Sequence, residues 1–513
     1  MADDGVDAAA RPARLQFALL ASVFVVAACG LAYELIAGAL ASYLLGDSVT
    51  QFSTVIGAYL FAMGVGSWLS KYVERDLVGR FVQIEIAVGL VGGFTAAALF
   101  VAFAANLGPF RVLLYGAVFA VGVLVGLEIP LVMRILKRDV AFNELVARVL
   151  SFDYLGALAV SILFPLLLAP HLGLVRTGFL FGLLNAAVAL WALYLFREQL
   201  ARRTGLLAAG LASVVLLAGG FAGAGQLTTM AEGWIYADDI IHAETTPYQR
   251  IVVTRWRDDV RLFLNQNLQF SSKDEYRYHE ALVHPGLAGM AHARRALVLG
   301  GGDGFAVREI LKYPNIESVT LVDLDPAMTR LFSSASLLRQ LNDDALNSPR
   351  VKIVNADAAR WLETNDASFD FIVADFPDPS NYSIGKLYSA PFYRLLTRSL
   401  APHGRLVVQA TSPFHARQSF WTVVATLADA GLKTVPYHAL VPSFGEWGFI
   451  LAARESYRPP ETYPVALRFL TPRTTAAMFE FPADMARVDA EVNRLNNQVL
   501  VRTFESEWRH VVR

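Results

Sequence analysis

The stretch LVLGGGDGFAVRE, residues 297–309, decides the fold of the second half of the chain. An apolar run leads into three consecutive glycines, and a run with helical spacing follows them. Strand, glycine loop and helix in this order are typical of nucleotide-binding α/β units, where the glycines let the backbone approach the ligand. The loop also carries Asp303, whose carboxylate would repel a phosphate. We therefore expect a ligand that needs glycines and a negative charge together.

Strand-like and helix-like segments alternate around this loop. The strand-like runs are residues 296–300, 318–325, 351–357, 369–375 and 404–410, and a helix-like segment at 306–314 follows the loop. Alternation of this kind predicts a parallel sheet with its ligand at the carboxyl ends of the strands. Residues 286–455 are accordingly expected to form a Rossmann-like α/β domain.

Four of these units end in an acid: Asp303, Asp323, Asp357 and Asp375. Any one of them is explained by a helix N-cap or a turn, but four along one sheet edge favour a binding site. Asp323 follows Asp303 by 20 residues, close to the spacing at which an acid binds ribose hydroxyls in dinucleotide folds. The glycines Gly300 and Gly302 precede no Lys-Ser/Thr pair, which argues against an ATPase.

The first half has a different composition. Hydrophobic residues make up 55% of the 513 residues and charged residues 17%, and the mean hydropathy is +0.42. The apolar excess lies almost wholly before residue 225. Because a bilayer core of roughly 30 Å needs about 20 apolar residues per helix, the chain offers seven candidate spans. They lie near residues 15–45, 52–70, 81–106, 110–133, 150–169, 174–196 and 205–224. Residues 1–225 are therefore expected to form an all-α transmembrane bundle of about seven helices.

The charges of the loops predict an orientation. Basic residues follow the second, fourth and sixth spans (Lys71, Arg75, Arg80, Arg134, Lys137, Arg138, Arg148, Arg197, Arg202 and Arg203), which places the N-terminus in the cytoplasm. The expected location is the inner cell membrane, as a multi-pass protein. With seven spans, the second half would lie outside the cytoplasm.

Three acids lie in or near the predicted spans. Glu34, within GLAYELIAG, either contacts a cationic substrate or makes a polar contact between helices. Glu85 and Glu128 lie close to segment ends and are expected to be structural. The net charge of −1 and the lack of a basic cluster exclude a nucleic-acid partner. The single cysteine, Cys29, excludes an intrachain disulfide and a cysteine-based metal site.

Two smaller regions flank the α/β domain. Residues 240–285 predict a small antiparallel β-sheet domain, with strands near 250–256 and 260–264 and a helix that opens at SSKDE. Residues 456–513 begin as a proline-rich linker and are expected to continue as a helical tail, over DMARVDAEVNRLNNQVLVRTFESEW (484–508).

Over residues 240–455 the motifs together resemble those of a known family. The motifs YQ, LFLN and DEYRYHE precede VLGGGDG, VDLD, ADA and DFPDP, and this combination resembles the polyamine aminopropyltransferases, the spermidine synthases. With its apolar first half, the chain resembles the membrane-bound bacterial branch of that family. The resemblance implies a small β-sheet domain packed on a methyltransferase-like α/β domain.

The resemblance also implies a reaction. The donor would be decarboxylated S-adenosylmethionine and the acceptor putrescine, so that spermidine and methylthioadenosine are formed. No tightly bound cofactor and no metal are implied, and the partners are small molecules and the lipid bilayer. A homo-oligomer remains open.

Residue roles follow by matching the motifs. Asp323 would bind the ribose hydroxyls and Asp357 the adenine amino group, while Gln249 and His279 line the donor pocket beside Gly300 and Gly302. Asp303 would bind the aminopropyl ammonium of the donor. Asp375 with Tyr278 would be catalytic at the attacking amine, and Asp378 would help to hold the diamine.

This assignment explains the acid in the glycine loop. Ordinary S-adenosylmethionine ends in a carboxylate, whereas the decarboxylated donor ends in an ammonium and carries a sulfonium as well. Asp303 attracts the second compound and penalises the first, so we expect it to select the donor.

Two departures from the family pattern lie on the acceptor side. The loop SNYSIGKLY (380–388) is one residue longer than the usual Gly-Pro-Ala version, and Pro442 stands where the family often has a tyrosine. Glu446 or Tyr382 is the candidate replacement for that contact.

Two other functions remain as alternatives: an S-adenosylmethionine-dependent amine N-methyltransferase and a non-catalytic polyamine-binding or transport protein. The side of the membrane on which the catalytic half lies also stays open. Loop charges place that half outside, whereas the donor is made inside.

Overall fold

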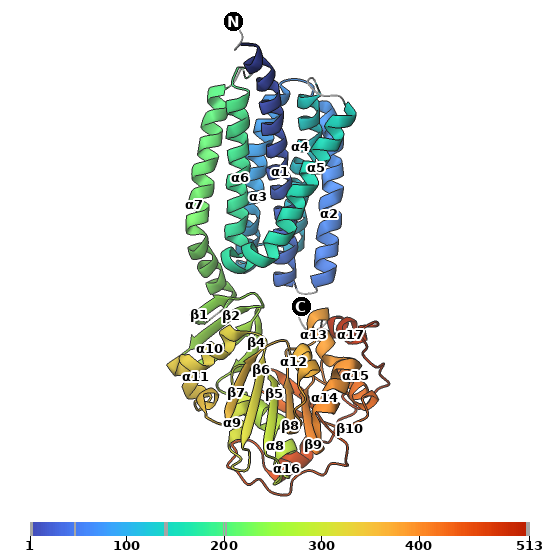
Figure 1. The fold of residues 1–513 in the computed structure, drawn as a ribbon. Coiled ribbons are helices and arrows are strands. Elements are labelled where there is room, and N and C mark those ends of the chain that lie inside the picture. Colours follow the sequence, from blue (N-terminus) through green and yellow to red (C-terminus); the bar gives the residue numbers. More distant parts are fainter. Residues whose placement is uncertain are drawn as a thin grey trace. The chain divides into compact units, whose positions relative to one another are not determined.

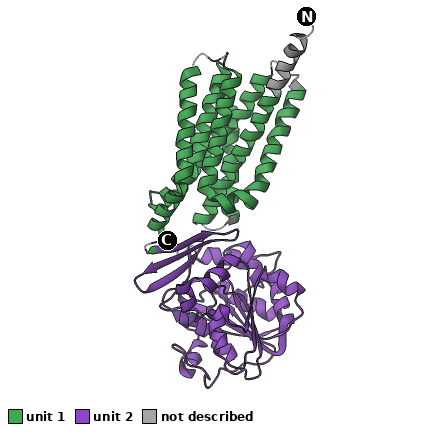
Figure 2. Cartoon of the chain, turned by 60° about the vertical axis from the view of Figure 1, so that its left-hand side comes forward, with its two compact units in different colours: residues 1–239 green, residues 240–513 purple. Residues whose placement is uncertain are grey.

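The computed structural model describes residues 4–45, 48–137, 142–198, 200, 203–236 and 238–508. The chain forms two compact units, Met1–Asp239 and Ile240–Arg513 (Figure 2). The first unit is all-α, and the second combines an antiparallel sheet with an α/β domain (Figure 1). The predicted fold class is confirmed.

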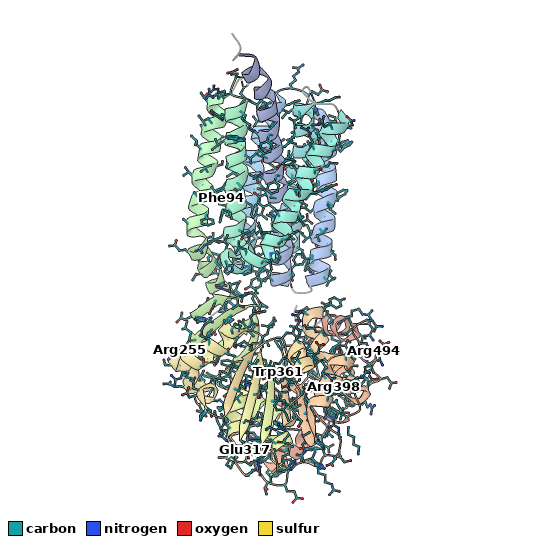
Figure 3. All side chains as sticks on the ribbon, in the orientation of Figure 1. Phe94, Arg255, Glu317, Trp361, Arg398 and Arg494 are labelled. Atoms are coloured by element: carbon teal, nitrogen blue, oxygen red, sulfur yellow. The ribbon has the colours of Figure 1, made fainter. Side chains whose placement is uncertain are left out.

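Long apolar helices build the first unit. They are α1 (Asp4–Leu45), α2 (Ser48–Leu69), α3 (Leu77–Ala104), α4 (Phe110–Leu136), α5 (Phe142–Leu163), α6 (Ala169–Leu195) and α7 (Arg203–Ile235). Helix α1 packs against α2, α3, α4, α5 and α6, and α7 packs against α3 and α6. Many large apolar side chains of this unit are exposed, and Phe94 is one of them (Figure 3).

Six helical stretches among the described residues are long and apolar enough to cross a membrane, which indicates membrane association. The stretch Asn143–Leu195 has 53 residues and contains two of the seven predicted spans. As one straight helix it would reach roughly 80 Å, far more than a bilayer core. A π-helical turn at Phe164–Leu168 and a left-handed Gly173 (φ 74°) interrupt it. Both α5 and α6 pack against α1, so the chain folds back at this break.

The second unit opens with a four-stranded antiparallel sheet in the order β1-β2-β3-β4. Its strands are β1 (Asp239–Thr245), β2 (Arg250–Trp256), β3 (Asp259–Leu264) and β4 (Asn267–Ser271). The strands predicted near 250–256 and 260–264 are present, whereas β1 and β4 were not predicted. In β1, exposed and half-buried residues alternate without a fully buried face, so the sequence of β1 carries little apolar signal. Helix α8 (Glu275–Leu287) follows.

A seven-stranded sheet in the order β10-β11-β9-β8-β5-β6-β7 forms the centre of the α/β domain. The five predicted strands are parallel to one another: β5 (Arg295–Gly300), β6 (Ser318–Asp323), β7 (Val351–Asn355), β8 (Phe369–Asp375) and β9 (Leu400–Gln409). An antiparallel hairpin, β10 (Lys433–Val441) and β11 (Gly445–Ala453), extends the sheet beside β9. This hairpin was not predicted.

Helices cover both faces of this sheet. They are α9 (Phe305–Leu311), α10 (Pro326–Ser334), α11 (Ser336–Leu341), α12 (Ala358–Thr364), α13 (Tyr382–Gly385), α14 (Ala390–Ser399) and α15 (Arg417–Asp429). Along β5, Ala296 and Val298 enter the core that contains α8 and α9, whereas Leu297 and Leu299 enter the core that contains α14 and α15. A strand buried on both faces explains the unbroken apolar run before the glycine loop.

The tail is only partly helical. Helices are confined to α16 (Pro472–Met478) and α17 (Val499–Trp508), and the described segment 479–498 between them has no helix or strand. The prediction of a helix over residues 484–508 is therefore wrong for residues 484–498 and correct only for α17. Asn493 explains the difference, because its side chain donates to the carbonyls of Gly385 and Tyr388 at 3.2 and 3.1 Å. Contacts with the α/β domain replace the internal bonds of a helix.

Candidate active site

The glycine loop lies tightly against the end of β8. Gly300, Gly301 and Gly304 have φ values of 77°, 64° and 81°, in the left-handed region that favours glycine. Gly300 is the register partner of Asp375 on β8, and a Cβ atom at Gly300 would lie 2.1 Å from the carbonyl oxygen of Asp375. The loop therefore brings the predicted donor residues next to the predicted catalytic acid.

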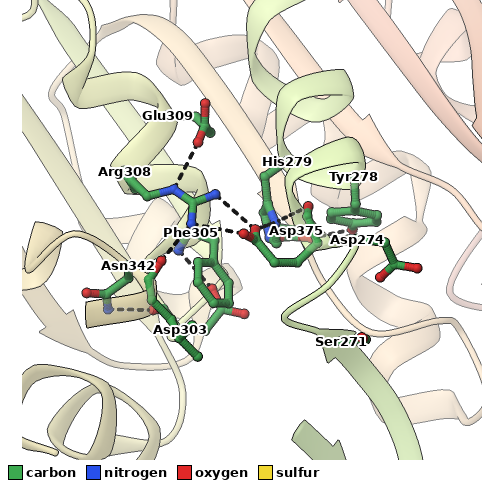
Figure 4. Close-up of polar contacts among 12 residues, drawn as sticks. Ser271, Asp274, Tyr278, His279, Asp303, Phe305, Arg308, Glu309, Asn342 and Asp375 are labelled. Atoms are coloured by element: carbon green, nitrogen blue, oxygen red, sulfur yellow. Dashed lines mark hydrogen bonds and ion pairs between the residues drawn. The ribbon is translucent and has the colours of Figure 1, made fainter. Parts of the chain in front are cut away.

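Tyr278 and Asp375 form the central contact of the site. The hydroxyl of Tyr278, on α8, donates to Oδ1 of Asp375 at 2.6 Å (Figure 4). Burial raises the pKa of Asp375 to about 6 against the opposing effect of His279, while Asp303 raises it further and the Tyr278 hydrogen bond lowers it. A carboxyl group with a pKa near 6 is suited to accept a proton at neutral pH.

Asp303 lies in the same group of acids. Its Oδ1 accepts from the backbone N–H of Phe305 at 3.0 Å, and Asn342 donates to its backbone carbonyl at 2.8 Å. Burial raises the pKa of Asp303, with Glu275 adding to the rise, while His279, the Phe305 N–H and Arg308 lower it. The Asp303 and Asp375 carboxylates repel each other, and a cation bound between them would relieve that repulsion.

A buried ion-pair network holds His279. Its Nδ1 lies 2.9 Å from Oε2 of Glu275, which also pairs with Arg308 at 2.9 Å (Figure 4). Burial lowers the pKa of His279, but the Glu275 contact outweighs it, so the pKa lies above its ordinary value. Glu275 and Arg308 were missed by the sequence reasoning. The i, i+4 spacing of Glu275 and His279 on a helix was the available signal.

The end of β6 carries a second acid-lined surface. The Asp323 carboxylate accepts from the backbone N–H of Asp325 at 2.9 Å and from the backbone of Gly302. A Cβ atom at Gly302 would lie 2.7 Å from Oδ2 of Asp323. Burial raises the pKa of Asp323 to about 6, and Asp303 contributes to the rise. Gln249 approaches this edge through Nε2, which donates to Oδ2 of Asp325 at 3.1 Å.

Asp357 differs from the other acids because both of its carboxylate oxygens already have partners. Its Oδ1 caps α12 by accepting from the backbone N–H groups of Ala359 and Arg360, and its Oδ2 pairs with Nζ of Lys386 at 2.7 Å. Burial raises its pKa, but the Lys386 hydrogen bond and the capping N–H groups bring it below its ordinary value. The N-cap explanation of this Asp is therefore correct for one of its two oxygens.

Asp378 occupies a buried polar corner beyond β8. The hydroxyl of Thr411 donates to its Oδ2 at 3.4 Å, and the Gln409 side chain also hydrogen-bonds to it. Its Oδ1 is buried and has no hydrogen-bond partner among the described residues. Burial raises the pKa of Asp378 to about 7 despite both hydrogen bonds. An unsatisfied buried oxygen of this kind fits an ammonium donor from a ligand.

The C-terminal helix reaches this corner. Trp508 on α17 donates through Nε1 to the Thr411 hydroxyl at 3.4 Å, and Trp447 donates to Oε1 of Gln409 at 3.1 Å. Thr411 itself has a left-handed backbone, with φ of 35°. Gln409, Thr411 and Trp508 were missed because they lie far apart in the sequence.

The two residues expected to replace the tyrosine contact to the acceptor have these surroundings. Glu446 forms a hydrogen bond with Nδ1 of His438, and Tyr382 is 41% exposed. Among the residues that the structure describes, no group of three or more His, Cys, Asp or Glu side chains could hold a metal ion.

Comparisons with known proteins identify the family of this chain. Residues 275–462 match the family described as spermine/spermidine synthase domain. Polyamine aminopropyltransferase 1 of Ralstonia nicotianae is 62% identical over 99% of both chains, and the polyamine aminopropyltransferase of Leptospira interrogans is 51% identical over 97% of this chain and 100% of its own. The solved spermidine synthase of Thermotoga maritima is 23% identical, with a TM-score of 0.44 over 48% of this chain and 85% of its own.

The near full-length identity to the curated relatives confirms the resemblance found in the sequence. Members of this family use decarboxylated S-adenosylmethionine and polyamines as small-molecule substrates. The chain therefore belongs to the polyamine aminopropyltransferase family and is an aminopropyl-transferring enzyme.

Proposed function

We propose that this enzyme transfers the aminopropyl group of decarboxylated S-adenosylmethionine to putrescine and releases spermidine and methylthioadenosine. The observation that carries the proposal is the 2.6 Å contact of Tyr278 with Asp375, next to a glycine loop that carries Asp303. A proton acceptor and a carboxylate for a cationic donor thus lie at one edge of the sheet.

The donor binds at the edge of the sheet that is formed by β5, β6 and the glycine loop. Asp323 binds the ribose hydroxyls, and Asp303 binds the aminopropyl ammonium, because its burial makes an unpaired negative charge costly. Gln249 and His279 line the pocket together with Gly300 and Gly302. Asp357 binds the adenine amino group through the oxygen that Lys386 occupies, so Lys386 must share or leave that oxygen.

The acceptor binds on the side of the site where Asp375 and Asp378 lie. One ammonium of the diamine satisfies the free Oδ1 of Asp378, and the other end of the diamine reaches Asp375. This arrangement distinguishes a diamine from a monoamine, because a monoamine leaves one of the two buried carboxylates unpaired.

The reaction is a displacement at the methylene beside the sulfonium. An aliphatic amine has a pKa of roughly 10.4, by analogy with lysine, so almost none of it is nucleophilic at neutral pH. Asp375 accepts the proton of the attacking amine while Tyr278 holds the carboxylate in place. The nitrogen forms a bond to the carbon, the carbon–sulfur bond breaks, and its electron pair leaves on the sulfur as neutral methylthioadenosine. Alignment of nitrogen, carbon and sulfur supplies much of the acceleration.

We further propose that the enzyme works without a tightly bound cofactor and as a multi-pass protein of the inner cell membrane. The apolar outer surface of the first unit and its six long apolar helical stretches support this location. Self-association as a homo-oligomer is compatible with both parts of the proposal.

The test uses the purified full chain with putrescine and either decarboxylated or ordinary S-adenosylmethionine. Spermidine and methylthioadenosine are expected with the first donor only, by mass spectrometry. Asp375→Asn is expected to reduce turnover on the order of 100-fold or more, the typical contribution of a general base. S-adenosylhomocysteine as the product would instead establish methyl transfer, and full turnover of Asp375→Asn would remove Asp375 from the mechanism.

A further inference from the structure

The helical unit buries two carboxyl groups that the catalytic proposal does not use. Glu85 on α3 and Glu128 on α4 are 0% and 1% exposed. Both lie inside their helices rather than at the helix ends, where the sequence had suggested a merely structural role. Charged groups inside an apolar bundle are costly and mark functional sites.

Hydrogen bonds connect Glu85 to two other helices. Asn185 on α6 donates through Nδ2 to Oε2 of Glu85 at 2.7 Å, and the hydroxyl of Tyr33 on α1 donates to Oδ1 of Asn185 at 3.0 Å. Asn185 and Tyr33 are 0% and 4% exposed. This chain of contacts fixes one oxygen of Glu85 and orients the other.

The remaining oxygens lack partners. Oε1 of Glu85 and Oε1 of Glu128 are buried, and neither has a hydrogen-bond partner within the described part of the chain. The two acids are close enough to interact electrostatically, and Glu128 also interacts with Tyr33 and Tyr59. No lysine, arginine or histidine among the described residues forms an ion pair with either acid. The cluster is thus short of both hydrogen-bond donors and positive charge.

We propose that Glu85 and Glu128 form a binding site for a protonated primary amine inside the helical unit. A primary ammonium has three N–H donors and one positive charge, which match the two unsatisfied oxygens. A metal ion fits less well, because no described group of three His, Cys, Asp or Glu residues is arranged to hold one.

The choice of a polyamine as the ligand rests on the proposed function, since the second unit handles aliphatic amines. The existence of the site rests on the unsatisfied oxygens alone. Both acids are closed off from solvent, so the amine enters through movement of the helices. The break at Gly173, near the start of the helix that carries Asn185, is a place where the backbone can adjust.

The first test is equilibrium binding of labelled spermidine to the full chain in lipid nanodiscs. Wild-type protein is expected to bind one equivalent at the catalytic acceptor side, which Asp378→Asn removes, and a second equivalent in the bundle. The double variant Glu85→Gln with Glu128→Gln is expected to lose the second equivalent, with affinity at least about 10-fold lower, and to keep its turnover. Glu144→Gln, an exposed acid of α5, is the matched control and should bind like wild type.

Binding by a folded double variant that equals wild type would overturn the proposal. Spermidine formation would be a separate measurement, so its absence would contradict the catalytic proposal and not this one.

A second test needs no variant. Dicyclohexylcarbodiimide labels carboxyl groups in apolar surroundings, and mass spectrometry locates the labelled residue. Spermidine is expected to slow the labelling of Glu85 or Glu128 on the wild-type protein. Equal labelling with and without spermidine would show a protonated carboxyl pair without an amine ligand, and would overturn the proposal.

Discussion

At the scale of single residues, Asp303 is the group on which we expect donor selectivity to depend. Asp303→Asn removes the negative charge from the glycine loop but keeps a similar shape. We expect kcat/KM for the decarboxylated donor to fall roughly 10- to 100-fold, the equivalent of a lost charge-assisted hydrogen bond. Ordinary S-adenosylmethionine should become a better competitive inhibitor, because its carboxylate is no longer repelled. Inhibition constants for wild type and variant measure this, and an unchanged ratio would contradict the assignment.

The role of Asp375 as a proton acceptor predicts that kcat/KM depends on pH. Only the deprotonated carboxylate accepts a proton, so kcat/KM should rise with pH through about 6, the pKa of Asp375 in the ligand-free site. The Tyr278 hydrogen bond stabilises the charged form and lowers that pKa. Tyr278→Phe should therefore move the rising limb to higher pH as well as reduce the rate. Rate profiles between about pH 5 and 9 test this, and a limb that stays in place would show that another group titrates.

The sequence located these residues because strand ends and glycines leave a local signal. Asp303, Asp323 and Asp375 follow apolar runs directly, and parallel topology brings such positions to one edge. Gln409 and Trp508 contact the acceptor corner only through long-range folding. No local pattern distinguishes them from ordinary strand and helix residues, so they required the structure.

At the scale of elements, we predict that helix α17 affects how tightly the enzyme binds the diamine acceptor. Trp508 on α17 donates to Thr411, which donates to Asp378. Trp508→Phe keeps the ring beside His415 and Phe504 but removes the N–H donor. We expect KM for the diamine to rise a few-fold, in line with about 1 kcal/mol for one hydrogen bond, with KM for the donor unchanged. Arg502→Gln, on the same helix and exposed, is the control. Equal effects on both substrates would indicate general loss of packing.

The same scale shows where sequence patterns fail. Strands β5, β6, β8 and β9 have buried residues on both faces, whereas the edge strand β7 is only half-buried, and their apolar runs identify these strands directly. In strand β10, buried and exposed residues do not alternate regularly, because the three consecutive residues 434–436 are all half-buried. In addition, a proline such as Pro436 argues against a central strand when only the sequence is known. Segment 484–498 has a composition typical of helices, but it is not helical, and the side chain of Asn493 fixes it to the α/β domain through hydrogen bonds. Tertiary contacts override local propensity at both places.

At the scale of the whole molecule, the acids of the catalytic unit link stability to pH and ligand. Burial raises the folded-state pKa of Asp323, Asp375 and Asp378 to about 6, 6 and 7, above an unfolded value near 4. Such groups contribute stability that is fully present below the unfolded pKa and is lost as pH rises through the folded pKa. The ligand-free catalytic unit is therefore weakened by these acids at neutral pH and above.

A doubly positive donor offsets this effect at Asp375, because it supplies positive charge next to that carboxylate and Asp303. We expect decarboxylated S-adenosylmethionine to raise the melting temperature of the catalytic unit more at pH 8 than at pH 5. At the lower pH these acids are largely protonated, so binding the cation must first expel protons. Calorimetry of the full chain at matched ionic strength measures both shifts, and it resolves the two units if they unfold separately. Asp378→Asn should raise the ligand-free melting temperature at pH 8 and hardly change it at pH 5, since the variant removes a buried charge present only at the higher pH. Equal donor-induced shifts at both pH values would mean that Asp375 does not face the bound cation.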